Sequence, residues 1–139
     1  MRNRWLAVVF VLIAGAGVAG CGQAQTVPRK AARVTIGAAT HTVRPASCTQ
    51  TQSYRTLDIS DHDAHVEAVV ILSGYRAIPQ WVKIRNFDGF TGSFWQGGVG
   101  DAHADLTNNA YTITGSAYGI SNSNPNKTVT TDFKIIAEC

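Results

Sequence analysis

The last twelve residues, Thr128-Val-Thr-Thr-Asp-Phe-Lys-Ile-Ile-Ala-Glu-Cys139, alternate between apolar and polar side chains. Successive side chains of a β-strand point to opposite faces, so this segment is expected to place Phe133 and Ile135 on one face and Lys134 on the other. Cys139 falls on the apolar face and is therefore expected to point toward a core. The expected core face consists of Val129, Thr131, Phe133, Ile135, Ala137 and Cys139.

The preceding hundred or so residues show the same pattern in shorter segments, separated by turn residues. Further strands are expected at residues 33–36, 40–43, 54–59, 65–72, 81–87, 90–95 and 111–118. Residues 65–72 also fit a short helix, although their β-branched content favours a strand. Residues 73–79 and 119–127 are expected to be loops. The spacing predicts an all-β domain, either a single antiparallel sandwich or a strongly bent sheet or half-barrel.

The N-terminal segment has the anatomy of a secretory signal. Arg2 and Arg4 precede an apolar run that is shorter than the roughly 20 residues of a membrane-spanning helix. The segment ends in Val18-Ala19-Gly20-Cys21, which resembles a bacterial lipobox. We expect residues 1–20 to be removed and Cys21 to receive an S-diacylglycerol and an N-acyl group. The alternatives are an ordinary signal peptide with an incidental cysteine, or an uncleaved anchor.

The chain has three cysteines, and an odd count in an exported protein normally leaves one thiol over. Lipidation of Cys21 removes that oddity and leaves Cys48 and Cys139 as a pair. Export to an oxidising compartment favours a disulfide between them over two buried free thiols. The predicted organisation is a signal peptide (1–20), a lipidated N-terminus and flexible tether (21–32), and a β domain (33–139).

The charge of the chain limits its partners. Of its twelve basic side chains, Arg2 and Arg4 lie in the removable segment, which leaves ten against nine acidic ones. A net charge near +1 argues against a nucleic-acid binder. Arg29, Lys30 and Arg33 follow the predicted anchor. They fit a contact with an anionic leaflet and a solubilising linker equally well.

Two clusters invite chemistry, and neither carries a strong signal. The segment from Asp58 to His65 holds three aspartates and two histidines, but residues three apart on a strand face opposite sides, so a solvated turn is expected rather than a metal site. Asp101 and His103 share a strand face, yet no nearby serine lies in a nucleophile elbow. We therefore expect no catalytic residue, no metal, no cofactor and no enzymatic activity.

Aromatic residues gather around a hairpin signal at Asp88-Gly89. Most are expected to belong to the core. Some are candidates for an apolar cleft that would hold a lipid or another small apolar ligand. The candidate cleft residues are Trp81, Phe87, Phe90, Phe94 and Trp95.

The chain resembles the mycobacterial 19 kDa lipoprotein antigen family. The resemblance rests on the order of Cys21, Cys48 and Cys139 and on the stretch Tyr111-Thr-Ile-Thr-Gly-Ser-Ala-Tyr-Gly119. It implies a lipid-anchored β domain of the cell envelope on the extracytoplasmic face of the membrane. It also implies an antigen without known enzymatic activity, whose acylated N-terminus engages host Toll-like receptors. The tether is shorter than the family's glycosylated Ser/Thr-rich segment.

Overall fold

The computed structural model describes residues 30–44 and 46–139, and all regular structure in this part of the chain is β-strand. The ten strands are β1 (Ala32–Ile36), β2 (Ala39–Val43), β3 (Ala46–Thr51), β4 (Tyr54–Asp61), β5 (Ala64–Ser73), β6 (Arg76–Phe87), β7 (Phe90–Trp95), β8 (Asp101–Thr107), β9 (Ala110–Ser121) and β10 (Asn124–Glu138). The predicted all-β class is confirmed. The segment that also fitted a helix is strand β5.

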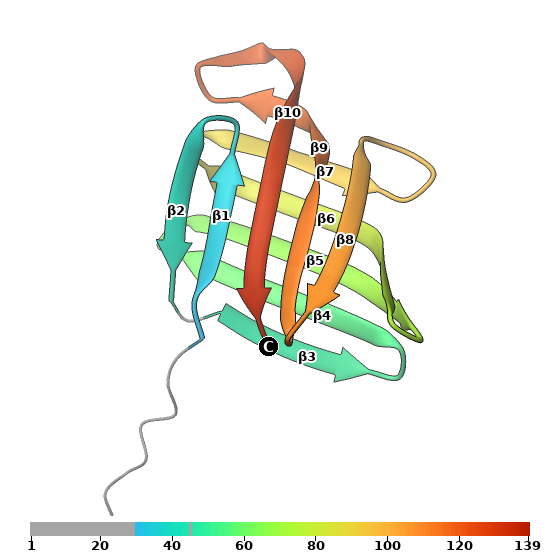
Figure 1. The fold of residues 1–139 in the computed structure, drawn as a ribbon. Helices are drawn as coiled ribbons and strands as arrows, with labels where there is room; N and C mark the ends of the chain where they lie inside the picture. Colours follow the sequence, from blue (N-terminus) through green and yellow to red (C-terminus); the bar gives the residue numbers. More distant parts are fainter. Residues whose placement is uncertain (1–29, 45) are drawn as a thin grey trace, which may run out of the picture.

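One continuous antiparallel sheet folds back on itself to form two layers, in the order β2-β1-β10-β9-β7-β6-β5-β4-β3. Strands β2, β1, β10, β9 and β8 form the front layer in Figure 1, and β7 to β3 cross behind them at a steep angle. This crossing resembles the orthogonal packing of two sheets. The prediction left a sandwich and a strongly bent sheet open, and the chain combines both.

Strand β9 is the main joint between the layers, and β8 also pairs with β6 at Ala104 and Ala77. Its first part pairs with β8 up to Ser116, and its last part pairs with β7 from Tyr118 onward. At this crossing Gly119 lies opposite Gly92 of β7. A Cβ atom on Gly119 would overlap the Thr91 carbonyl oxygen. Glycine is therefore needed here for the close approach of two backbones.

The space between the layers is filled by the apolar face of each strand. The prediction for the last strand is confirmed: Phe133, Ile135 and Ala137 are buried, while Lys134 is exposed. Val34 of β1 pairs directly with Ile135. Burial of each large apolar side chain contributes about 2 kcal/mol before the loss of conformational entropy.

Two segments expected to be loops are paired strands instead. Strand β9 continues to Ser121 and β10 begins at Asn124, so residues 119–127 form a hairpin that projects beyond the sandwich at the top of Figure 1. The polar composition of this segment predicts a loop. The segment is polar because the hairpin buries little side-chain surface, but hydrogen bonding between the backbones of two strands does not require burial. Pro125 lies in the register shift between Asn124 and Thr128, where proline's missing N–H is tolerated.

The other segment is residues 73–79, where Ser73-Gly74 and Pro79 predict a loop. A tight turn is present at Gly74 and Tyr75, but strand β6 already begins at Arg76. Pro79 lies opposite Val70, next to a register shift in the β5–β6 ladder. Such a bulge accommodates a proline inside a sheet.

Replacement of Gly119 by alanine should weaken the joint between the layers. The added methyl group must push the β7 backbone away, so we expect a loss of at least about 2 kcal/mol in the free energy of unfolding, measured by urea denaturation. Gly98→Ala is the matched control, because its Cβ would make only ordinary contacts with Trp95. Equal stability of the two variants would contradict this role of Gly119.

Candidate functional site

The predicted lipid-anchoring motif, Val18, Ala19, Gly20 and Cys21, lies outside the described residues, which begin at Lys30. Anchoring at Cys21 therefore stays a prediction. Within residues 30–44 and 46–139, the chain has no helix with the length and apolar character needed to cross a bilayer.

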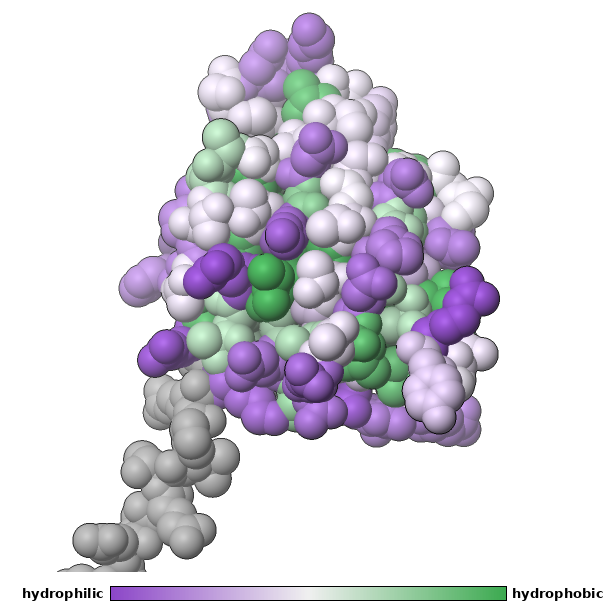
Figure 2. Space-filling model, viewed as in Figure 1, coloured by the Kyte–Doolittle hydropathy of each residue, from purple (hydrophilic) through white to green (hydrophobic). Residues whose placement is uncertain are grey.

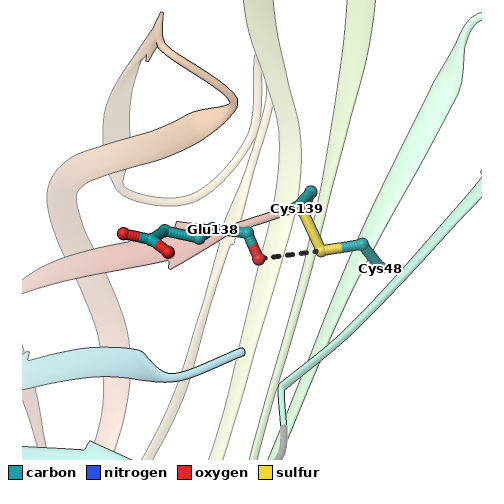
Figure 3. Close-up of a disulfide and its surroundings, with 3 residues drawn as sticks. All are labelled: Cys48, Glu138 and Cys139. Carbon is teal, nitrogen blue, oxygen red and sulfur yellow. Dashed lines mark hydrogen bonds between the residues drawn. A yellow bond between two sulfur atoms is a disulfide. The ribbon is translucent and has the colours of Figure 1, made fainter. Parts of the chain in front are cut away.

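The predicted disulfide between Cys48 and Cys139 is present (Figure 3). It joins β3 to the end of β10, with the two Cα atoms 5.8 Å apart and a separation of 91 positions in sequence. Cys48 Sγ also lies 3.8 Å from the carbonyl oxygen of Glu138. A disulfide sulfur carries no hydrogen, so this is a close contact and not a hydrogen bond.

Several chain segments converge around this disulfide. The backbone N–H of Ala46 donates to the carbonyl of Lys30 at 3.0 Å, and that of Cys139 donates to the carbonyl of Asn109 at 2.9 Å. The start of the described chain, the start of β3, the β8–β9 turn and the C-terminus thus meet. We call this the terminal end of the sandwich; it lies at the bottom of Figure 1.

The five aromatic residues predicted to line a cleft are divided between two faces. Phe87, Phe90 and Phe94 are buried in the core, whereas Trp81 is partly exposed and Trp95 is 48% exposed. Adjacent residues of a strand point to opposite faces, so Phe94 and Trp95 cannot line the same cleft. The structure therefore does not bring the five side chains together. The alternation of side chains along a strand was sufficient to predict this division from the sequence.

Trp81 and Trp95 pack against each other on the outer face of the back layer. Their ring centroids are 6.4 Å apart with nearly parallel planes, and Lys83 Nζ lies 4.7 Å from the Trp81 centroid and 5.6 Å from that of Trp95. The ammonium group is thus within range of cation–π attraction to both indoles.

This apolar surface extends across neighbouring strands in two rows. Val69 lies opposite Trp81, and Trp81 lies opposite Trp95. In the next row, Tyr54 lies opposite Ile71, and Ile71 lies opposite Ile78. We call this surface the aromatic face, defined by Tyr54, Val69, Ile71, Ile78, Trp81 and Trp95.

The histidine and aspartate cluster does not assemble into one site. His65 Nε2 lies 2.7 Å from Asp58 Oδ1, while His62 is 95% exposed at the β4–β5 turn and 3.8 Å from Asp61. His103 contacts Asp105 at 3.2 Å, so its partner is not Asp101. In the part of the chain that the structure describes, no three His, Cys, Asp or Glu residues are grouped to hold a metal ion.

One contact that sequence reasoning missed joins the two layers on the side away from β9. His41 Nε2 of β2 lies 2.8 Å from both carboxylate oxygens of Asp88 in the β6–β7 turn. The His41 ring also meets the Phe87 ring edge to face, with centroids 5.3 Å apart. The partners are 47 residues apart, and nothing in the local pattern around either indicates the other.

Loss of the disulfide should strongly destabilise the domain. The Cys48→Ser/Cys139→Ser variant no longer restricts a loop of about 90 residues in the unfolded chain. This corresponds to about 4–5 kcal/mol in the loop-entropy model. Urea denaturation of the variant, and of the wild-type chain with and without reductant, measures this loss. A variant as stable as the oxidised wild type would refute this contribution.

Comparison with known proteins identifies the family of the chain. The family model described as Mycobacterium 19 kDa lipoprotein antigen matches residues 25–139. The chain is 64% identical to "Probable lipoprotein LppE" of Mycobacterium tuberculosis over the full length of both. It is also 31% identical to a "Putative lipoprotein" of Mycobacterium avium subsp. hominissuis, covering all of this chain and 97% of that one. The chain therefore belongs to the mycobacterial 19 kDa lipoprotein antigen family.

Proposed function

We propose that this protein is an exported lipoprotein, anchored through lipidated Cys21 to the extracytoplasmic face of the cell membrane. Its β domain is a non-catalytic interaction module of the envelope that binds a partner through the aromatic face. The lipobox pattern from Val18 to Cys21 and membership of a lipoprotein antigen family support the anchoring.

The observation that carries the interaction role is the exposure of two aromatic side chains on the aromatic face, whose other members are partly or fully buried. Trp95 and Tyr54 are 48% and 46% exposed on the solvent side of the sheet. Outward positions of a solvated sheet are usually polar, and contiguous apolar patches mark interaction surfaces. Tryptophan and tyrosine are also the residues that most often dominate binding energy.

The opposite outer surface has a different character. The view in Figure 2, which shows the front layer, is dominated by hydrophilic and weakly polar side chains, with hydrophobic ones scattered among them. Threonines such as Thr35, Thr40 and Thr130 occupy outward positions there. The two outer faces of the sandwich thus differ, and the back layer is the one suited to partner contact.

Cys21→Ser should abolish labelling by a fatty-acid probe and leave unprocessed precursor or soluble protein, because the serine hydroxyl cannot form the thioether. Metabolic labelling followed by membrane fractionation measures both effects. A mature-sized, labelled and membrane-bound Cys21→Ser protein would overturn the proposed anchor.

Trp95→Ser should reduce cross-linking of the membrane-bound protein to envelope components. The variant is expected to stay folded, because the indole is half-exposed. Tyr118→Ser is the matched control, since Tyr118 is equally exposed at 48%. Photo-cross-linking in cells, quantified against the wild type, measures the effect. Equal losses in both variants, or no loss in Trp95→Ser, would contradict a specific role of the aromatic face.

A further inference from the structure

Arg55 of β4 is a cation without a partner anion. Its Nε is buried and has no hydrogen-bond acceptor. Its guanidinium carbon lies 5.9 Å from the centroid of the Tyr111 ring. The four ion pairs among the described residues all involve histidine, so no carboxylate there, including that of the C-terminus, pairs with Arg55. A partly buried guanidinium in this state is suited to bind an anion.

The space beside Arg55 can accept a small group. A pocket of about 230 Å³ is lined by Arg55, Leu72, Leu106, Asn109, Tyr111 and Cys139. Two leucines and the tyrosine ring give it an apolar wall, and the guanidinium gives it a positive group. This combination favours a ligand with an anionic group attached to an apolar body. The phosphate of a phospholipid, whose glycerol carries two acyl chains, has this chemistry.

The pocket lies at the terminal end of the sandwich. Two of its lining residues, Asn109 and Cys139, are hydrogen-bonded to each other there. Lys30 is part of the same end, and only eight residues separate it from Cys21. Even a fully extended segment of this length spans only about 30 Å, so lipidation at Cys21 would hold this end close to the bilayer. This step rests on the proposed function.

Exposed apolar side chains lie next to the pocket. Leu106, which lines it, is 36% exposed and also borders a larger groove of about 620 Å³ that runs to Tyr75 at the β5–β6 turn. Tyr75 is fully exposed, with a relative accessibility of 101%. Tyrosine is enriched where a membrane meets water, because its ring is apolar and its hydroxyl is polar.

Charged side chains of both signs lie at this end, where Asp105 borders the larger groove. Arg33 and Arg44 line a further pocket beside the start of β1, where Glu138 is the acidic residue. Each basic side chain near an anionic membrane surface adds to the electrostatic attraction between the domain and the membrane. This attraction falls off within a Debye length.

We propose that the terminal end of the domain docks on the membrane and that the Arg55 pocket binds the phosphate of an anionic phospholipid. Tyr75 and Leu106 enter the interfacial layer beside it. The lipid on Cys21 brings the domain to the bilayer, and the Arg55 pocket orients it there.

The test uses residues 22–139, which contain all the described strands, the described core and the disulfide, but not Cys21. Binding to phosphatidylcholine vesicles with and without phosphatidylglycerol is measured by co-sedimentation. We expect binding only to the anionic vesicles. Arg55→Gln should weaken it about tenfold, because a charge-assisted hydrogen bond to the phosphate is lost. Lys127→Gln removes the same charge from the hairpin at the opposite end and should have little effect.

A second variant covers the case in which Arg55→Gln fails to fold. Tyr75 is fully exposed, so Tyr75→Ser should leave the unfolding midpoint unchanged and weaken binding to the anionic vesicles several-fold. Normal vesicle binding by a folded Arg55→Gln variant, or by Tyr75→Ser, would overturn the proposal. Equal losses in Lys127→Gln would also overturn it, because they would indicate attraction by net charge alone.

Titration with inorganic phosphate and glycerol 3-phosphate separates the two sources of the anion. Arg55-dependent binding of these free anions without vesicle binding would overturn the assignment to lipid. If the protein bound neither these free anions nor the anionic vesicles, the assignment of the Arg55 pocket as an anion site would be overturned. Because the tested chain carries no lipid, these results are independent of Cys21, whose labelling tests the anchor separately.

Discussion

Strand β9 hydrogen-bonds to β10 along one edge and, along the other, first to β8 and then to β7. Because β9 pairs with strands of both layers, one antiparallel sheet folds into two layers. At these crossings the backbone of β9 approaches those of β8 and β7 more closely than a side chain would allow. Gly115 meets β8 and Gly119 meets β7 at the two contact points. A Cβ at either position would overlap a carbonyl oxygen of the neighbouring strand. The packing of Ile113 and Ala117 against the back layer depends on this geometry.

The side away from β9 is closed by side chains instead of a continuous ladder. His41 and Asp88 join β2 to the β6–β7 turn, and Cys48 and Cys139 join β3 to the end of β10. The disulfide lies at the end of the sandwich that the chain enters from the N-terminal side. The same end therefore combines the covalent closure of the domain, the unpaired guanidinium of Arg55 and the exposed ring of Tyr75. Anchoring and orientation on a membrane would use adjacent parts of the protein, while the aromatic face stays available on the back layer.

Much of the fold could be predicted from alternation alone. Period-two patterns identified most strands and the inward face of β10, and cysteine parity together with export identified the Cys48–Cys139 pair. Local sequence patterns did not predict strands that pair without burying their side chains, as in the β9–β10 hairpin. They also did not predict the start of β6, where a bulge accommodates Pro79. They also carry no information about contacts between distant strands. The His41–Asp88 contact and the Arg55–Tyr111 contact could not be foreseen for that reason. The predicted aromatic cleft combined residues of two faces, because Phe94 and Trp95 are adjacent in β7 and their side chains point to opposite sides.

The central claim is that the terminal end faces the bilayer. It can be tested on the lipidated protein in nanodiscs whose headgroups carry a paramagnetic label, by measuring the broadening of backbone amide signals. The account predicts strong broadening at Tyr75 and Leu106 and little at Asn124 and Lys127 of the opposite hairpin. Uniform broadening, or stronger broadening at that hairpin, would contradict it.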